Sequence, residues 1–223
     1  MNKKLIIVKR NSFLFNGKEY SFNDLEEISN LLKSNIKVIL LEEELYSKHF
    51  HEKVRKIKLK EFVAQKINNE FPDSSDILYN YEQNKTHRTI AIYSSKGGIR
   101  IDKISERAKN LEVKPMQYII QACMQNILDN KLGDSKILIK FNGYYYYVSF
   151  QKGLFYYGFV EKEMNIIINR ILECEQQGQI YVDDNIEDSS FFKENFKLIK
   201  INIGDLLNEQ VYTKQKFHSK AIL

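Results

Sequence analysis

The acidic segment DDNIEDSSFFKE is the part of the sequence that comes nearest to a known metal-binding pattern. Four of its residues would stand at positions 1, 3, 5 and 12 of a calcium loop: Asp183, Asn185, Glu187 and Glu194. The sharp turn of such a loop needs glycine at position 6, where this chain has Asp188. The preceding QIYV is also typical of a strand, where the motif has a helix. We therefore expect a solvated acidic loop and no metal site.

Two histidines and a pair of glycines are the next candidates for chemistry. His49 and His51 would alternate onto one face of a strand, as two imidazole ligands do, but no third and fourth ligand follows at a recognisable spacing. SSKGGIR lacks the GxxxxGKS/T spacing of a phosphate-binding loop, so a turn is expected there. The sequence also has no GxSxG and no cysteine beside a histidine. It therefore predicts no catalytic, cofactor-binding or metal-binding residue, and no enzyme.

The basic segment KVRKIKLK carries five cationic side chains within eight residues and is flanked by two phenylalanines. Its apolar residues alternate with charged ones, which predicts a strand. Such a strand could bind single-stranded nucleic acid or an acidic protein surface, and it could also be a solvated edge whose like charges prevent strand pairing. The candidate partner-binding residues are Phe50, Lys53, Arg55, Lys56, Lys58, Lys60 and Phe62.

The composition limits the function classes. With 223 residues and 43% hydrophobic content, the chain can form one large domain or two small ones with a substantial core. Its 34 basic and 29 acidic side chains give a formal charge of +5, well below that of a dedicated nucleic-acid binder. Cys123 and Cys174 form no framework of pairs, which fits a reducing compartment. No apolar run has the length of a membrane span or signal-peptide core, so we expect a soluble, cytoplasmic chain.

The N-terminal part predicts β structure, one helix and a buried strand. Two short strands should meet around Lys9–Ser12, and the Asn-Gly pair at 16–17 is a typical hairpin turn. Ser21 or Asn23 can cap a helix that runs to about Leu32. KVILL, a few residues further on, is apolar on both faces, as a buried parallel strand is.

The middle of the chain predicts alternating helices and strands. EFVAQKINNEF has helical spacing and stops before Pro72. ILYNYE and TIAIYSSKGGI predict two strands, and Ile104–Asn110 and Pro115–Asn130 predict two helices. Because strands and helices intermix, the class is α/β or α+β.

The aromatic stretch Ile137–Val160 predicts three antiparallel strands joined by tight turns at Asn-Gly 142–143 and Lys-Gly 152–153. The four tyrosines at 144–147 alternate in the middle strand, two facing each way, so both faces of this sheet should be covered. EKEMNIIINRILECEQQ predicts the helix that covers one face, and QIYV and LIKINI predict late strands.

Four stretches resemble the cytoplasmic domains of two families, PilM and the general-secretion-pathway L proteins. INNEFPDSSDILYNYE resembles their helix, E-x-Pro turn and following strand, and KVILLEEELYSKHFHEKVRKIKLKEF resembles the strand, hairpin and helix before it. AKNLEVKPMQYIIQACMQNIL is similar to their next two helices and the turn between them. INIGDLLNEQVYTKQKF is similar to the segment that precedes the single membrane span of the L proteins.

The resemblance implies an actin-like fold of two related RNase H-like subdomains, each built from mixed sheets and helices and each opening with a β-meander. It divides the chain into a first subdomain, 1–132, with a small subdomain inserted at about 46–98, and a second subdomain, 133–210. A basic juxtamembrane tail, 211–223, would follow.

The resemblance also bears on nucleotide binding. In active actin-like ATPases the turns of the two meanders hold nucleotide phosphates, and an early Asp in each meander helps to bind the metal. Lys9 and Lys140 stand near those positions here, and lysine cannot coordinate Mg²⁺. We therefore expect a degenerate nucleotide site without a cofactor.

The function that the resemblance implies is a non-catalytic scaffold in the inner-membrane platform of a type IV pilus or type II secretion system. The expected partners are the assembly ATPase and bitopic and polytopic platform proteins, but no nucleic acid, and a homodimer is left open. The expected location is the cytoplasmic face of the inner membrane, with a membrane span after Leu223. The juxtamembrane lysines would be Lys214, Lys216 and Lys220.

Three alternatives stay open. The chain could be an actin-like ATPase that binds nucleotide through unrecognised residues, or a nucleic-acid-binding module that uses the basic segment. The C-terminal lysines could belong to a loose basic tail without a following span.

Overall fold

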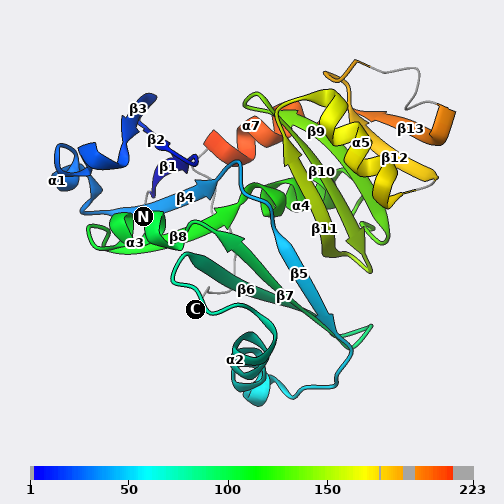
Figure 1. Cartoon of the computed structure of the whole chain (residues 1–223), viewed down its shortest axis with the longest axis horizontal. Helices are drawn as coiled ribbons and strands as arrows, with labels where there is room; N and C mark the ends of the chain where they lie inside the picture. Colours follow the sequence, from blue (N-terminus) through cyan, green and yellow to red (C-terminus); the bar gives the residue numbers. More distant parts are fainter. Residues whose placement is uncertain (1–2, 176, 188–193, 213–223) are drawn as a thin grey trace.

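The computed structural model describes residues 3–175, 177–187 and 194–212. Two five-stranded sheets stand side by side, and a three-stranded sheet lies below them (Figure 1). We call them the first sheet, the second sheet and the small sheet. The predicted tail lysines lie outside the described residues, as does part of the acidic loop.

The first sheet has the strand order β3-β2-β1-β4-β8. The first three strands form an antiparallel meander, β4 pairs parallel to β1, and β8 pairs parallel to β4. Asn16 and Gly17 adopt left-handed φ values of 51° and 79°, as the predicted hairpin turn requires. The strands are β1 (Lys4–Val8), β2 (Ser12–Phe15), β3 (Lys18–Ser21), β4 (Asn35–Leu40) and β8 (Asn110–Pro115).

The second sheet repeats this order as β11-β10-β9-β12-β13. Again an antiparallel meander comes first, and two parallel strands follow it. The predicted three-stranded meander is therefore present, and its two tight turns lie where the glycines predicted them. The strands are β9 (Ser135–Phe141), β10 (Tyr144–Gln151), β11 (Leu154–Glu161), β12 (Gly178–Asp183) and β13 (Phe196–Ile201).

The small sheet lies between β4 and β8 in the sequence and has the order β5-β7-β6. One face of it packs on helix α2 through Leu59, Val63, Ile90 and Ile92. Its elements are β5 (Tyr46–Phe50), β6 (Ile77–Asn84), β7 (Thr89–Lys96) and α2 (Leu59–Glu70).

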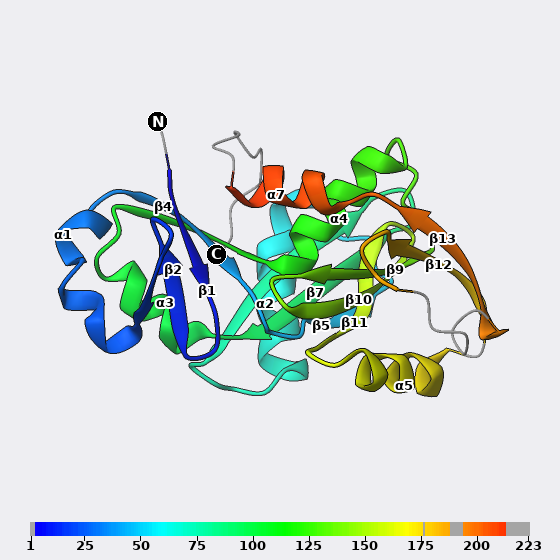
Figure 2. The same cartoon turned by 90° about the horizontal axis from the view of Figure 1, so that it is seen from above.

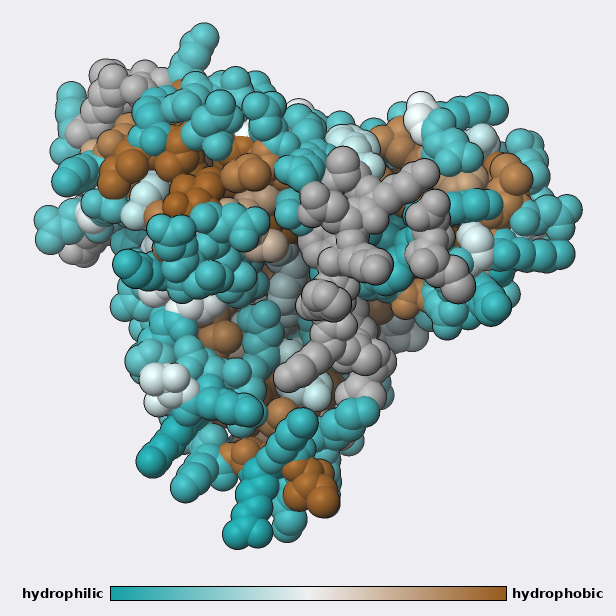
Figure 3. All heavy atoms as spheres, turned by 180° about the vertical axis from the view of Figure 1, so that it is seen from behind, coloured by the Kyte–Doolittle hydropathy of each residue, from teal (hydrophilic) through white to brown (hydrophobic). Residues whose placement is uncertain are grey.

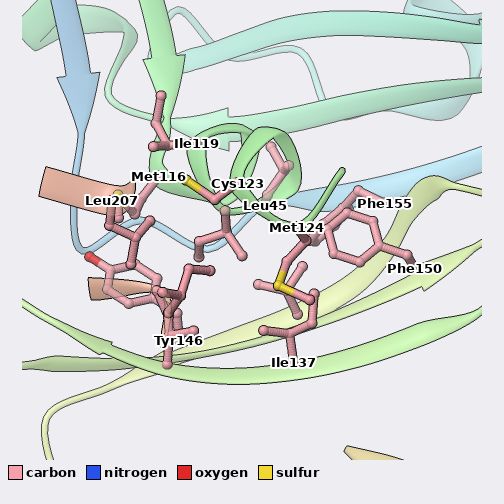
Figure 4. Close-up of a cluster of buried hydrophobic side chains, with 14 of the residues drawn as sticks. Leu45, Met116, Ile119, Cys123, Met124, Ile137, Tyr146, Phe150, Phe155 and Leu207 are labelled. Carbon is pink, nitrogen blue, oxygen red and sulfur yellow. The ribbon is translucent and has the colours of Figure 1, made fainter. Parts of the chain in front are cut away.

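Helices cover both faces of the second sheet (Figure 2): α5 (Met164–Cys174) lies on one side, and α4 (Met116–Ile127) and α7 (Gly204–Tyr212) lie on the other. The largest core cluster fills the space between α4, α7 and the two large sheets. Figure 4 shows Met116 and Cys123 of α4 beside Tyr146 of β10 and Leu207 of α7. This core joins the two halves of the molecule.

The tyrosine run lies in a sheet that is covered on both faces. Tyr146 belongs to the core cluster under α4, and Tyr147 belongs to the cluster under α5. Both side chains are fully buried. The Tyr147 hydroxyl donates to a carboxylate oxygen of Glu175 over 3.0 Å, which satisfies its polar end. The prediction that both faces are covered is confirmed, and these aromatic rings build the sheet.

The predicted helix Ile104–Asn110 is wrong. Helix α3 (Gly98–Ser105) ends where that helix was to begin, and β8 starts at Asn110. Two interactions with Asp76 set the start of α3: its carbonyl accepts from the Gly97 and Gly98 N–H groups, both over 2.9 Å, and its carboxylate accepts from the Ile99 N–H over 3.2 Å. The turn expected at SSKGGIR is therefore also a helix start.

The predicted helix from Ser21 to Leu32 is broken into two short pieces, a 3-10 helix η1 (Phe22–Glu26) and α1 (Ser29–Leu32). Ser21 caps η1 with Asp24, as expected of a capping box. Ile28 adopts φ −108° and ψ 6°, which interrupts the helical run while leaving its own side chain in the core.

Candidate docking site

A cavity of about 290 Å³ lies where the first sheet, the small sheet, α3 and α4 meet. Strands β6 and β8 both line it, and each is the last strand of its sheet. Most of the wall is apolar. The lining residues are Leu40, Leu45, Leu78, Tyr79, Asn80, Tyr93, Ser95, Ile101, Asp102, Leu111, Val113, Pro115 and Tyr118.

A hydrogen-bonded cluster forms the polar side of this cavity. The Asn80 amide donates to the Tyr118 hydroxyl over 3.1 Å, and the Tyr93 hydroxyl donates to the Glu82 carboxylate over 2.9 Å. Burial raises the pKa of Glu82, and the bonds from Tyr93 and Gln121 oppose that shift only in part. These bonds fix the rings in the wall, so the cavity has a defined shape.

Helix α3 is held against the cavity by a close approach of backbones. A Cβ atom on Gly98 would lie 2.5 Å from the Ser75 carbonyl oxygen, so only glycine fits there. The helix then carries Ile101 and Asp102 to the cavity wall.

The two lysines near the expected nucleotide site belong to the two meanders. Lys9 directly follows β1, and its ammonium group pairs with Glu19 over 3.0 Å. Lys140 is in β9, and its ammonium group lies 5.1 Å from the centre of the Tyr145 ring. Neither position offers an oxygen ligand for a cation.

A run of glutamates after β4 lies beside the turn of the first meander. The Arg10 backbone N–H donates to the Glu42 carboxylate over 3.2 Å, and the Arg10 guanidinium donates to the Glu42 carbonyl over 3.0 Å. Glu42 itself adopts a left-handed φ of 66°, a strained conformation for this residue. The meander turn is thus occupied by a carboxylate of the chain itself.

The next two glutamates complete an ionic cluster between the halves. Glu43 is buried and pairs with Arg100 over 2.8 Å. Glu44 pairs over 2.5 Å with Arg170 of α5, which also reaches Glu161 over 2.7 Å. We call Arg10, Glu42, Glu43, Glu44, Arg100 and Arg170 the ionic cluster.

Asp183 of the acidic loop lies at the end of β12 and is fully buried. Neither of its carboxylate oxygens makes a hydrogen bond within the described residues. Burial raises its pKa, and the nearby backbone N–H groups of Asn185 and Lys140 oppose this shift only in part. Among residues 3–175, 177–187 and 194–212, no three His, Cys, Asp or Glu side chains come together as a metal site.

The two histidines do not form a ligand pair. His49 Nε2 lies 2.8 Å from the Phe155 carbonyl oxygen, and His51 Nδ1 lies 3.1 Å from the Thr89 hydroxyl. Burial lowers the pKa of His49, and the hydrogen bond with the Phe155 carbonyl opposes this shift only in part.

The predicted basic strand is wrong in its secondary structure. Strand β5 ends at Phe50, a loop follows, and η2 (Lys56–Lys58) leads into α2. Leu59 lies in the first turn of α2 and is buried under the small sheet. The alternation of apolar and charged residues that predicted a strand therefore comes from a turn followed by the start of a helix. All five cations are exposed: Lys53, Arg55, Lys56, Lys58 and Lys60.

The two phenylalanines of the predicted docking strip, Phe50 of β5 and Phe62 of α2, are half-buried and face each other. Their ring centres lie 6.0 Å apart in an edge-to-face arrangement, and the Lys66 ammonium group lies 4.9 Å from the Phe50 ring and 5.4 Å from the Phe62 ring. The cation that contacts these rings is therefore Lys66, which lies outside the predicted basic segment. The role of the cations in partner binding stays a prediction.

Helix α7, which leads toward the C-terminal residues, is tied to the first sheet by a buried lysine. The Lys37 ammonium group donates to the Gln210 carbonyl near the end of α7 over 2.8 Å. Burial lowers the pKa of Lys37 to about 8, and Lys114 adds to that shift. None of the helices in the described part of the chain combines the length and the apolar character that crossing a bilayer would need.

No protein-family model and no curated protein sequence matches the chain. Solved structures do match it. A protein of unknown function with an actin-like ATPase fold from Bacteroides thetaiotaomicron has a TM-score of 0.53 and 10% identity, over 89% of this chain and 90% of the other. The cytoplasmic domain of EpsL, an inner-membrane component of the Vibrio cholerae type II secretion system, has a TM-score of 0.51 and 8% identity, over 97% of both chains.

The PilM–PilN type IV pilus biogenesis complex also matches, with a TM-score of 0.53 and 8% identity, over 92% of this chain and 90% of the other. At such identities the likeness shows the fold alone. The chain has the actin-like ATPase fold, which confirms the predicted fold class. The two families that the sequence resembles are both represented among the similar structures.

The cavity and the ionic cluster were not found from the sequence. The cavity is lined by six strands and helices that are distant in the chain, and no local pattern marks it. The ionic cluster had one visible signal, the run of three glutamates directly after a buried strand. Its arginine partners lie 32, 57 and 126 residues from the glutamates they contact.

Proposed function

We propose that this chain is a non-catalytic scaffold on the cytoplasmic face of an inner-membrane platform, in a type IV pilus or a type II secretion system. The fold that it shares with the EpsL cytoplasmic domain and PilM supports this role. Its proposed work is to hold platform proteins and the assembly ATPase together at the membrane.

One observation carries the non-catalytic part. The Glu42 carboxylate accepts a hydrogen bond from the Arg10 backbone N–H, in the meander turn that would have to receive a phosphate. Glu43 forms an ion pair with the nearby Arg100. A phosphate entering there would displace one carboxylate and lie beside the other, so like charges would oppose it.

The proposed docking site for a bitopic platform protein is the cavity between β6 and β8. Neither strand has a second neighbour among the described residues, so an extended segment can pair with a strand edge while its side chains enter the cavity. The apolar wall with fixed tyrosine rings favours aliphatic side chains. The complex of PilM with PilN supports the idea that this fold receives a platform partner.

Calorimetry tests both parts of the proposal. In the first titration, ATP with Mg²⁺ is added to the chain, and we expect no heat of binding. Micromolar binding would contradict the scaffold and favour the nucleotide-binding alternative.

In the second titration, the probe is a synthetic peptide of the cytoplasmic segment of a bitopic platform protein from the same organism. We expect Leu78→Ser to weaken binding about tenfold, because the cavity loses an apolar wall residue. Leu31→Ser is the matched control, since Leu31 is 48% exposed and lies outside the cavity. Equal affinity of the two variants would exclude the cavity as the docking site.

A further inference from the structure

The positive charge of the chain is concentrated in the small subdomain. Residues 46–98 hold ten basic and six acidic side chains, a net charge of +4 out of +5 for the whole chain. The remaining residues hold 24 basic and 23 acidic side chains and are nearly balanced. Within the small subdomain, residues 53–60 hold five cations and no carboxylate, and we call these residues the basic tip.

The basic tip projects from one end of the molecule. Figure 1 places α2 and the segment that leads into it at the end of the molecule remote from α7. The space-filling view shows long hydrophilic side chains projecting from that end, with hydrophobic side chains exposed between them (Figure 3). The surface is convex, so it does not form a pocket around a partner.

One aliphatic side chain stands at the apex of the tip. The Lys58 N–H donates to the Arg55 carbonyl over 2.9 Å, which makes a turn with Lys56 and Ile57 at its centre. Ile57 is 89% exposed, more than any other large hydrophobic residue of the described chain. Leu59, two residues later, is buried under the small sheet and anchors the turn.

The cations of the tip are not neutralised by the protein. Lys48 and Lys66, elsewhere in the small subdomain, pair with Glu70 and Glu52. In contrast, within the described ranges no carboxylate lies at ion-pair distance from the five cations of the tip. Their charge is therefore available to an external anionic surface.

We infer that the basic tip binds the anionic headgroups of a phospholipid bilayer and inserts Ile57 among them. In a bilayer, the negatively charged headgroups lie directly above an apolar interior. The lysines beside Ile57 can therefore contact the headgroups while the Ile57 side chain inserts between them. An acidic protein would need a pocket for one protruding aliphatic residue, and the two half-buried phenylalanines that could widen such a contact pack against each other and Lys66. This inference rests on the proposed function, to which it adds a second contact with the platform membrane.

Vesicle co-sedimentation of the whole chain tests the inference. The probes are vesicles of phosphatidylcholine alone and vesicles of equal parts phosphatidylglycerol and phosphatidylcholine. We expect binding to the anionic vesicles at least about tenfold stronger than to the neutral ones, and its loss at about 0.5 M salt. Equal binding to both vesicles, or no binding to either, would overturn the inference.

Two variants locate the contact. Lys56→Glu with Lys58→Glu should reduce anionic-vesicle binding at least about tenfold, and Ile57→Ser should reduce it about threefold through lost apolar insertion. The matched control is Lys33→Glu with Lys131→Glu, two exposed lysines outside the small subdomain. All the changed side chains are exposed, so unfolding is not expected. If the charge reversal at the tip reduces vesicle binding no more than the control does, the inference is wrong.

The outcome is separable from that of the proposed function. The tip reversal should leave binding of the platform peptide unchanged, and Leu78→Ser should leave vesicle binding unchanged, because the cavity does not include the tip. If the tip reversal abolishes binding of the assembly ATPase while vesicle binding persists, the tip is a protein-docking surface and the lipid contact is excluded.

Discussion

The two large sheets each have a parallel strand that leads to acidic residues. In the first sheet, β4 runs parallel to β1 and is followed by Glu42 and Glu43. In the second sheet, β12 runs parallel to β9 and ends at Asp183. The two sheets have the same strand order, so these acidic groups occupy equivalent ends of equivalent strands. Their surroundings differ. Glu43 pairs with Arg100, whereas Asp183 is buried without a hydrogen-bond partner in the described part of the chain.

The turns beside the acidic groups explain part of this difference. β1 ends at Val8 and β2 starts at Ser12, which leaves a turn long enough to place Arg10 over Glu42. The equivalent turn of the second meander contains only Asn142 and Gly143, and it carries no cation. The comparison teaches that sheet topology places an acidic residue, while the turns and insertions around it decide whether it is neutralised.

Breaking the ionic cluster should give the largest effect. We expect Arg100→Met to lower the free energy of unfolding by about 3 kcal/mol, because Glu43 would stay buried while losing its closest cation. Urea unfolding at neutral pH measures this. Adding Glu43→Gln to the same chain should restore part of the loss, since the uncompensated charge is then gone.

The control for that prediction is the exposed pair Lys9 and Glu19 of the same half. Burial distinguishes the two pairs, so Glu19→Gln should change the unfolding midpoint little. If Arg100→Met and Glu19→Gln have equal effects, the buried pair of Glu43 and Arg100 does not stabilise the fold more than an exposed pair does.

Removing the charge of Asp183 should give the opposite sign. We expect Asp183→Asn to raise the free energy of unfolding by about 1 kcal/mol at neutral pH, because a buried carboxylate without a partner is replaced by a neutral group. Thermal or urea unfolding measures the gain. The exposed Glu187→Gln is the control and should change little.

The pH dependence of this gain follows from the direction of the pKa shift. The pKa of Asp183 in the folded chain is raised above its ordinary value of 3.8. Below pH 3.8 the carboxyl is protonated in both the folded and the unfolded state, so the wild type and the Asp183→Asn variant should differ little in stability. As pH rises through the raised pKa, the wild type loses stability relative to Asp183→Asn. A gain that is constant with pH would show that the charge is not its cause.

The fold was predictable where local patterns agree with the topology. Asn-Gly pairs and alternating residues predicted both meanders, and the apolar KVILL predicted the parallel strand β4. The error at Ile104–Asn110 has a physical cause: that segment is divided between a helix started by Asp76 and a strand paired to β4. Both contacts come from distant parts of the chain, so no window of sequence around these residues contains them.

The candidate sites show the same limit. The resemblance assigned Lys9 and Lys140 to the two meanders, and the structure has one lysine directly after β1 and the other in β9. The basic tip was predicted by its charge but assigned to a strand, because Ile57 and Leu59 alternate with lysines. The local pattern does not distinguish these two residues, yet one is 89% and the other 8% exposed. Only the packing of α2 separates them.

The smallest expected effects compare the turns that the two halves share. Gly17 joins β2 to β3 and Gly153 joins β10 to β11, with φ values of 79° and 76°, and a Cβ atom on either would meet nothing within 4 Å. Only the left-handed backbone therefore penalises a side chain, and Gly17→Ala and Gly153→Ala should each lower the free energy of unfolding by about 1 kcal/mol. Urea unfolding of the two variants measures the pair. Equal losses of unfolding free energy would show that the two meanders differ in their charged neighbours and not in their turns. If the loss at one turn is several times the loss at the other, the two turns are not equivalent.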